Sequence, residues 1–305
     1  MSVTKVEDHI YLIDAETAGM KDFIASYVVL GKQVAMVETG PTSSVPNVLK
    51  ALEKLSVPLE EVKYVAVSHI HLDHAGGAGT LLKHLPNAQV IVHPRGVPHL
   101  AHPEKLWEQS QRVLGDITRL YGAPEPIPED RTISASDGMV FDLGNEVQLS
   151  VLETLGHASH HQSYYESSSQ AVFPGDAAGI YLNKIDVIVP TTPPPLRLDV
   201  AIASIEKLVS RRPRSLLYSH FGKSSEAILK LHTYEDQLRL WARIAKQGLD
   251  NHESLETISK LIIEKDAELQ KALQYVKVHP VLGETVLGNS IQGVVDFVQR
   301  YGIAP

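Results

Sequence analysis

The sequence contains no cysteine. Disulfide bonds, thiolate-ligated zinc and catalysis by a thiol nucleophile are therefore excluded. No apolar run approaches the roughly 20 residues that a membrane-spanning helix needs, and aromatic residues make up only 6% of the chain. Residues 1–8 carry charges where a secretory signal peptide has its apolar stretch, so we expect a cytoplasmic protein without a membrane partner.

Positive charge is also in short supply. The chain has 28 Lys and Arg against 36 Asp and Glu, which gives a net charge of -8. Such a surface offers little general attraction to a phosphate backbone, so we expect a small-molecule substrate and no nucleic-acid partner. Histidine, in contrast, is abundant, with 15 residues of which several are clustered.

Short β-type runs alternate with helical patterns through the first 222 residues. Apolar and β-branched spacing predicts strands at 10–13, 24–30, 33–37, 62–68, 88–93, 139–143, 146–155, 162–166, 170–173 and 215–218. Helical spacing predicts helices at 45–55, 80–85, 104–121 and 198–209, and a helical tail from 224 onward. This mixture predicts an α/β fold. We expect one domain over residues 1–222 with an insertion at about 94–130, and a helical extension over 223–305 packed on it.

The segment from His69 to His74 follows a predicted buried strand directly and reads His-Ile-His-Leu-Asp-His. Alternate side chains of an extended segment share a face, so His69 and His71 point together. As the chain turns into the next helix, Asp73 and His74 reach the same cavity from its opposite side. Imidazole and carboxylate groups suit zinc, iron or manganese, so the segment predicts a metal site.

Three later strands each end in another residue of a ligand type. Gly156-His157, Gly175-Asp176 and Ser219-His220 lie just past predicted strands. The ends of strands are where α/β folds build their sites. We therefore expect these three side chains to join the histidine cluster.

These motifs, in this order, resemble those of the metallo-β-lactamase fold hydrolases over about residues 5–222. The resemblance implies a four-layer αβ/βα sandwich with a two-metal site at one edge. It assigns His69, His71 and His157 to one metal, and Asp73, His74 and His220 to the other, with Asp176 bridging both. The implied cofactors are two divalent ions, with zinc as the first expectation and iron or manganese as alternatives. Glu38 stands where the family usually has Asp, so its hydrogen bond needs a longer reach.

Two divalent ions that share a water lower the pKa of that water toward neutrality. The expected reaction is therefore hydrolysis by a metal-bridging hydroxide, with Asp73 as the catalytic residue that orients the nucleophile and receives its proton. The run Gly156–Ser163 is similar to that of the quorum-quenching lactonases and related esterases, which favours small esters or lactones. Those lactonases carry a substrate-polarising tyrosine three residues after the bridging aspartate. Here Gly179 has that position, and the nearest tyrosine, Tyr181, is the candidate for substrate binding.

Other functions stay open from the sequence. They are a glyoxalase II-like thioesterase, a phosphodiesterase or phosphotriesterase, a nucleic-acid processing enzyme and a non-catalytic metal-binding module. A homodimer is also left open. We expect His160 and His161 to support the ligands, and His93, His99 and His102 not to form a third metal site. The insertion, the loop 190–195 and the C-terminal helices are expected to wall the pocket, whereas Trp107 and Trp241 are expected to pack in the interior.

Overall fold

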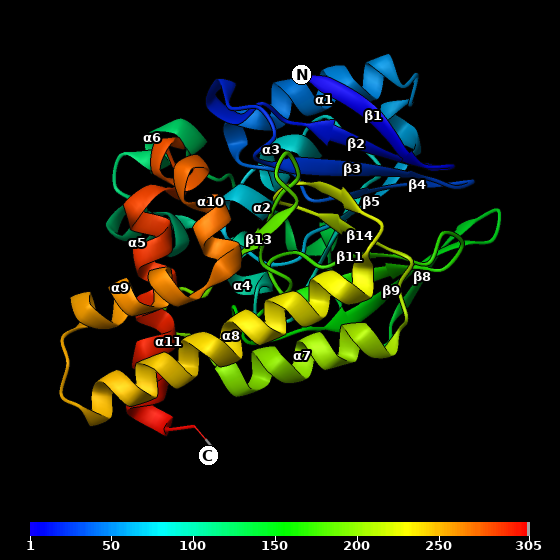
Figure 1. Cartoon of the computed structure of the whole chain (residues 1–305). Coiled ribbons are helices and arrows are strands. Elements are labelled where there is room, and N and C mark those ends of the chain that lie inside the picture. The colour runs from blue at the N-terminus through cyan, green and yellow to red at the C-terminus, as the bar shows by residue number, and fades with distance from the viewer. Residues whose placement is uncertain (304–305) are drawn as a thin grey trace.

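Two β-sheets form the centre of the protein, and the computed structural model shows helices outside both of them (Figure 1). It describes residues 1–303, apart from the side chains of 284 and 285. The first sheet has its strands in chain order: β1 (Ser2–Glu7), β2 (Ile10–Asp14), β3 (Ala25–Leu30), β4 (Val34–Val37), β5 (Val62–Ala66), β6 (Gln89–Val92) and β7 (Thr132–Ser134). Strands β1 to β4 are antiparallel, and β4 to β7 are parallel.

The second sheet has the order β15-β14-β11-β10-β9-β8. Its strands are β8 (Val140–Gly144), β9 (Val147–Glu153), β10 (Gln162–Glu166), β11 (Ala171–Phe173), β14 (Ser215–Tyr218) and β15 (Gly222–Ser224). Strands β11 and β14 run parallel, and α7 (Leu198–Ser210) lies between them in the chain. A separate two-stranded ribbon pairs β12 (Ile180–Leu182) with β13 (Val187–Val189). Strand β15 extends to Ser224, so the domain boundary expected at 222 falls inside a strand.

The alternation of side chains along each strand produces two apolar layers. In β4, Ala35 and Val37 join the core between the sheets, whereas Val34 and Met36 join the core under the helices. Helices α1 (Val45–Lys54) and α3 (Ala78–Leu82) contribute to that second core, as do α7 and α8 (Ala227–Asp250). The expected αβ/βα sandwich is therefore confirmed. Short 3-10 turns occur at Thr17–Gly19, Thr42–Ser44, Leu59–Glu61 and Glu129–Arg131.

Three short helices occupy the insertion: α4 (Val97–Ala101), α5 (Glu104–Leu114) and α6 (Ile117–Tyr121). The single helix expected at 104–121 is wrong, because Gly115 ends α5 with a φ of 54°. Glycine adopts this left-handed backbone without the steric cost of a side chain, so the chain changes direction there. This change lets α6 pack against the turns at Thr17–Gly19 and Thr42–Ser44, which follow strands β2 and β4.

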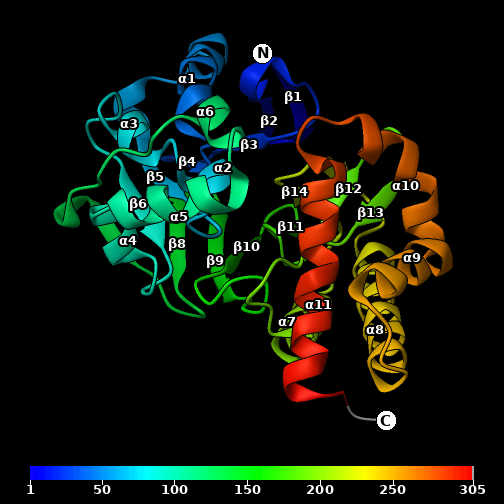
Figure 2. The ribbon, with the colours of Figure 1, turned by 90° about the vertical axis from the view of Figure 1, so that its left-hand side faces the viewer.

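The C-terminal extension is helical, as expected from its apolar spacing. After α8 come α9 (Leu255–Lys265), α10 (Ala267–Val278), a π-helical turn η5 (Leu282–Val286) and α11 (Leu287–Tyr301). Figure 2 shows α11 between the sandwich and helices α8 to α10. Trp241 of α8 is fully buried, and its indole N–H donates to Asp266 Oδ2 at 2.7 Å. None of the helices in residues 1–303 combines the length and the apolar character that crossing a bilayer requires.

Candidate metal centre

Four chain segments converge at one edge of the sandwich. His69 and His71 follow β5, and the single-turn helix α2 (Leu72–Ala75) carries Asp73 and His74. The other three side chains come from the segments after β9, β11 and β14, and they are His157, Asp176 and His220. The structure brings all seven together, because their strands end at this same edge. Their potential ligand atoms form three groups, each within 4.8 Å: His69–His71–His157, Asp73–His74–His220 and His69–His74–Asp176.

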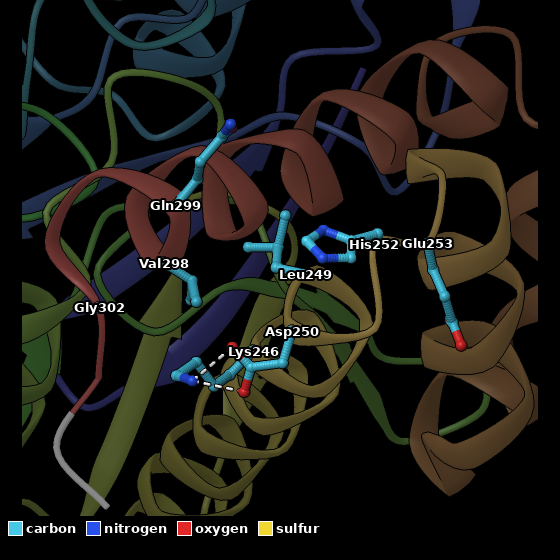
Figure 3. Close-up of a pocket in the computed structure, with 8 residues that line it drawn as sticks. All are labelled: Lys246, Leu249, Asp250, His252, Glu253, Val298, Gln299 and Gly302. Atoms are coloured by element: carbon cyan, nitrogen blue, oxygen red, sulfur yellow. Dashed lines mark hydrogen bonds and ion pairs between the residues drawn. The ribbon is translucent and has the colours of Figure 1, made fainter.

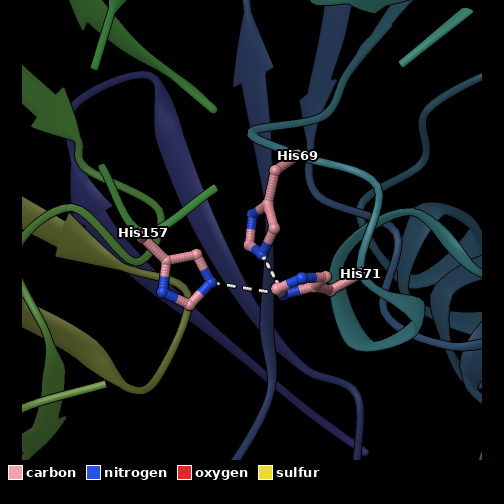
Figure 4. A group of neighbouring side chains, drawn as sticks. All are labelled: His69, His71 and His157. Carbon is pink, nitrogen blue, oxygen red and sulfur yellow. Dashed lines mark hydrogen bonds between the residues drawn. The ribbon is translucent and has the colours of Figure 1, made fainter. Parts of the chain in front are cut away.

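The first cluster consists of His69, His71 and His157 (Figure 4). His69 Nε2 lies 2.8 Å from His71 Nδ1, and His157 Nε2 lies 3.2 Å from that same atom. His157 Nδ1 is 2.9 Å from the carbonyl oxygen of Thr191. Since a carbonyl oxygen only accepts, Nδ1 carries the hydrogen and the lone pair of Nε2 faces the cluster. This is the tautomer that a metal-binding histidine needs.

The second cluster consists of Asp73, His74 and His220. His220 Nδ1 donates to the carbonyl oxygen of Phe23 at 2.8 Å. Its Nε2 atom is therefore the nitrogen that faces the cluster, 3.3 Å from His74 Nε2 and 3.4 Å from Asp73 Oδ2. Behind His74, the Oε1 atom of Glu38 lies 3.4 Å from Nδ1. The longer side chain of Glu38 thus reaches the position at which the family's usual aspartate would act.

Asp176 lies between the two clusters and offers one oxygen to each. Its Oδ1 atom is 3.3 Å from His74 Nε2 and 3.9 Å from His220 Nε2. Its Oδ2 atom is 3.4 Å from His157 Nε2. The Oδ1 atom is buried and has no hydrogen-bond partner. A buried carboxylate that has an oxygen without a hydrogen-bond partner and imidazole nitrogens on both sides fits a pair of bound cations.

The two clusters hold protons differently. Burial, reinforced by His157, lowers the pKa of His71 to about 3. Burial and the neighbouring His74 place the pKa of His69 well below its ordinary value. Burial would also lower the pKa of His74, but the carboxylates of Asp176 and Glu38 outweigh it and raise that pKa well above its usual range. His74 of the second cluster therefore attracts a proton, whereas His69 and His71 of the first stay uncharged.

Burial would raise the pKa of Asp73, but His74 and a hydrogen bond from His220 hold it below its ordinary value. Burial likewise opposes charge on His220, and its hydrogen bond to Asp73 raises its pKa nonetheless. The Asp73 carboxylate therefore stays ionised and balances positive charge in the cluster.

His161 supports the cluster, in line with the sequence-based expectation for its position. It is fully buried, and its Nε2 atom accepts the backbone N–H of Asp176 at 3.0 Å. Its Nδ1 atom therefore carries the hydrogen and donates to Thr154 Oγ1 at 2.9 Å. His160 lines the adjoining cavity, and burial lowers its pKa to about 4.

A cavity of about 620 Å³ opens beside the two clusters. Its walls come from the insertion, from the proline-rich loop after β13, and from η5 and the start of α11. Apolar side chains line much of it, among them Phe23, Leu106, Val113, Tyr121, Leu282 and Val286. Arg112 is the one Lys or Arg among the described lining residues, and its largely exposed side chain pairs with Glu108. The cavity thus offers little recognition for an anionic substrate.

Two tyrosines have places that the sequence did not predict. The ring of Tyr181 stacks on Tyr218, its hydroxyl donates to Asp186 Oδ1 at 2.8 Å, and its neighbour Ile180 lines the cavity. Because alternate residues of a strand face opposite ways, the expected substrate contact of Tyr181 is not supported. Tyr121 of α6 lines the cavity instead and is almost fully buried. Burial and the charge of Asp73 place its pKa well above the ordinary value, so its hydroxyl stays protonated.

The remaining histidines of the insertion do not join a metal-type group within residues 1–303. His93 Nε2 lies 3.0 Å from Glu153 Oε1, and its Nδ1 accepts the backbone N–H of Arg95 at 3.1 Å. His99 lines the cavity. We infer that His93 fixes the start of the insertion against β9.

A separate hollow of about 530 Å³ lies between α8 and α11 (Figure 3). Its charged groups include Lys246 and Asp250, which pair with each other at 2.6 Å. A surface ion pair of this kind contributes little free energy and provides no reactive group. The chemistry of the protein is therefore expected at the histidine-rich edge.

A sandwich of two sheets with a histidine- and aspartate-lined site at one edge defines a class in which most members are metal-dependent hydrolases. The sequence profile of the metallo-beta-lactamase superfamily matches residues 20–220, and the chain belongs to this superfamily. It is 29% identical over 228 residues to the metallo-beta-lactamase fold-containing protein ST1585 of Sulfurisphaera tokodaii, covering 73% of this chain and 82% of that protein.

Solved structures show the same fold. The ST1585 structure, described as from Sulfolobus tokodaii, matches with a TM-score of 0.72 at 23% identity, covering 94% of this chain and 98% of that one. The metallo-beta-lactamase family protein TTHA1429 from Thermus thermophilus also gives 0.72, at 19% identity over 98% and 95% of the two chains. BJP-1, a subclass B3 metallo-beta-lactamase of Bradyrhizobium japonicum, gives 0.58 at 19% identity over 82% and 96%.

Proposed function

We propose that this protein is a dinuclear metal-dependent hydrolase of small, uncharged esters or lactones with an apolar acyl part. The observation that carries the proposal is the position of Asp176, which offers one oxygen to each of two clusters. The donor set of imidazoles and carboxylates fits two divalent ions. His69, His71 and His157 would hold one ion, and Asp73, His74 and His220 the other.

Two divalent ions bound there would supply a water of lowered pKa as the nucleophile and positive charge against the developing oxyanion. The chain's own carboxylates divide the remaining work. The side chain of Asp73 is 23% exposed and that of Asp176 is 6% exposed, and both line the cavity. Asp73 therefore faces the reacting groups, orients the nucleophile and receives its proton. Asp176, held by His161, fixes the distance between the clusters.

Tyr121 takes the substrate-polarising role for which the sequence suggested Tyr181. Tyr121 lines the cavity, and its hydroxyl is protonated and within the electrostatic influence of Asp73 and Asp176. A hydrogen bond from this hydroxyl to the substrate carbonyl would strengthen as negative charge develops on that oxygen. The apolar part of the cavity wall would then hold the acyl part.

The competing substrates are ranked by their charge, because the described cavity lining has few positive side chains. Beyond the charge that two metal ions would supply, recognition of glutathione or of a phosphodiester would draw on positive side chains, and Arg112 is largely exposed and already paired. An uncharged phosphotriester avoids this requirement, so it ranks as a secondary substrate. Thioesters of glutathione and phosphodiesters rank below it.

The test is a matched panel of initial rates on the metal-loaded protein. The panel contains an alkyl-substituted γ-lactone, an aryl ester, a glutathione thioester, a phosphodiester and a phosphotriester. We expect the lactone or the aryl ester to exceed the thioester and the phosphodiester in kcat/KM by about a thousandfold, which corresponds to about 4 kcal/mol. A glutathione thioester or phosphodiester at the head of the panel would refute the proposed substrate class.

A further inference from the structure

The N-terminal half of α11 is bonded to the segment that follows β13. The backbone N–H of Thr192 donates to Ser290 Oγ at 3.2 Å, and Thr192 Oγ1 donates to the carbonyl oxygen of Ser290 at 2.8 Å. The Ser290 hydroxyl in turn donates a hydrogen bond to the carbonyl oxygen of Val286 at 2.9 Å. Ser290 is 1% exposed, so water does not substitute for these bonds.

Helix α11 and this segment also touch at a glycine. A Cβ atom added to Gly293 would lie only 1.9 Å from the carbonyl oxygen of Thr192. The side chain of any other residue would therefore push the helix and the segment apart. The absence of a side chain at 293 permits the close approach on which the Ser290 bonds depend.

The peptide unit that Ser290 holds is the one that orients a metal-cluster histidine. The N–H of Thr192 and the carbonyl group of Thr191 belong to the same planar peptide unit. Ser290 Oγ accepts from its N–H side, and His157 Nδ1 donates to its carbonyl side at 2.9 Å. A rotation of this plane would turn the carbonyl group away from His157 and release the imidazole ring.

We infer that Ser290 is a positioning residue of the metal centre, which acts on His157 through the Thr191–Thr192 peptide. The C-terminal extension thus sets the ligand geometry of the first cluster, although it supplies none of the seven residues of the cluster set. Hydrogen bonds to metal-binding histidines fix the tautomer and the direction of the lone pair, and their loss typically weakens metal affinity by about 10- to 100-fold. This inference rests on the proposed metal role of His157.

The experiment is a cobalt(II) titration of the metal-free protein, with the dissociation constant and the cobalt absorption spectrum as readouts. The background is His220→Ala, in which the first cluster alone stays complete. The variants are Ser290→Ala, which removes the acceptor for the peptide N–H, and Gly293→Ala, which forces the elements apart. Thr192→Val adds a milder change, because it removes only the second hydrogen bond. Gly288→Ala is the matched control on the same helix, since a Cβ there meets no atom within 4 Å.

We expect Ser290→Ala to weaken cobalt binding by about tenfold and to alter the absorption spectrum, with Thr192→Val in the same direction and Gly288→Ala unchanged. If Gly293→Ala does not fold, Ser290→Ala and Thr192→Val still decide the question. Variants that melt at lower temperature but bind cobalt within twofold of Gly288→Ala, with the same spectrum, would overturn this inference alone. A wild-type protein that binds no cobalt would overturn the proposed metal centre and this inference together.

Discussion

The first cluster is made of three imidazoles, whereas the second contains a carboxylate and faces two more. Burial keeps the pKa of His71 at about 3 and that of His69 well below its ordinary value, so these two imidazoles are uncharged at neutral pH. The carboxylates of Asp176 and Glu38 raise the pKa of His74 and hold a proton on the second cluster. A cation that enters the second cluster must therefore displace a proton from His74, whereas His69 and His71 of the first cluster offer uncharged imidazoles.

The largest effect is expected from removing the side chain of Asp176, which the two clusters share. Asp176→Ala leaves each cluster without its bridging oxygen, so we expect a loss of the second metal and a fall in kcat/KM of about a thousandfold or more. Metal content and initial rates on the ester or lactone substrate measure the change, with circular dichroism to check the fold. Asp199→Ala, at an exposed site on α7, is the control. Full turnover by the Asp176 variant would contradict the shared role.

The next prediction compares the two tyrosines as candidates for contacting the substrate. Tyr121→Phe removes a protonated hydroxyl from the cavity wall beside Asp73, and we expect kcat to fall by about a hundredfold. Tyr181→Phe removes a hydroxyl that is already bonded to Asp186, so its kcat is expected to stay near that of the wild type. The matched pair of variants is compared by steady-state kinetics on one ester. The reverse ranking would restore Tyr181 as the substrate contact.

A change of pH is expected to alter metal affinity differently at the two clusters. Below the raised pKa of His74 a proton occupies the second cluster, so metal affinity there falls as the pH falls. Each displaced proton costs about tenfold in affinity per pH unit. His69 and His71 of the first cluster, whose pKa values are lowered, gain no proton over the same range, so we expect the metal affinity there to change less. Zinc titrations between about pH 8 and pH 5 check this, and equal pH slopes at the two steps would contradict it.

A smaller effect is expected from a substitution at Glu38. Glu38→Gln keeps an oxygen near His74 Nδ1 but removes the charge, so we expect zinc binding at the second cluster to weaken by about tenfold at high pH. The difference in zinc affinity between variant and wild type is expected to become smaller as the pH falls. The reason is that the variant also lowers the pKa of His74, so protons compete less with zinc. Competition with a chelator at both pH values measures it. Glu53→Gln, at an exposed site on α1, provides the control.

Much of the sandwich was predictable because buried strands carry a strong local pattern. Strands β10 and β14 begin and end at the predicted residues, and the ends of β5, β9, β11 and β14 meet at one edge, as strand topology requires. Strand β1, which mixes charged and polar residues, was not predicted, and neither were the three-residue strands β7, β12, β13 and β15. So short a run shows little usable period, although β11, which is equally short, was predicted. The missed strand β12 explains why the face of Tyr181 was not predicted.

Long-range packing accounts for the rest. The place of Tyr121 depends on the break at Gly115, and helical spacing alone favoured a continuous helix across it. Ser290 lies 98 positions from Thr192 in the chain, and no local motif marks either residue. Sequence motifs thus indicate the groups that would bind metal. They do not reveal the distant elements that orient those groups or form the cavity.

The most direct test of the central claim is a zinc titration of the metal-free protein, with bound zinc and ester or lactone hydrolysis measured on the same sample. We expect two zinc ions per chain, and a rate that rises mainly as the second is bound, because that ion completes the Asp73–His74–His220 cluster. Full activity with one equivalent or none would contradict a dinuclear centre. Binding of no zinc at all would contradict the metal centre itself.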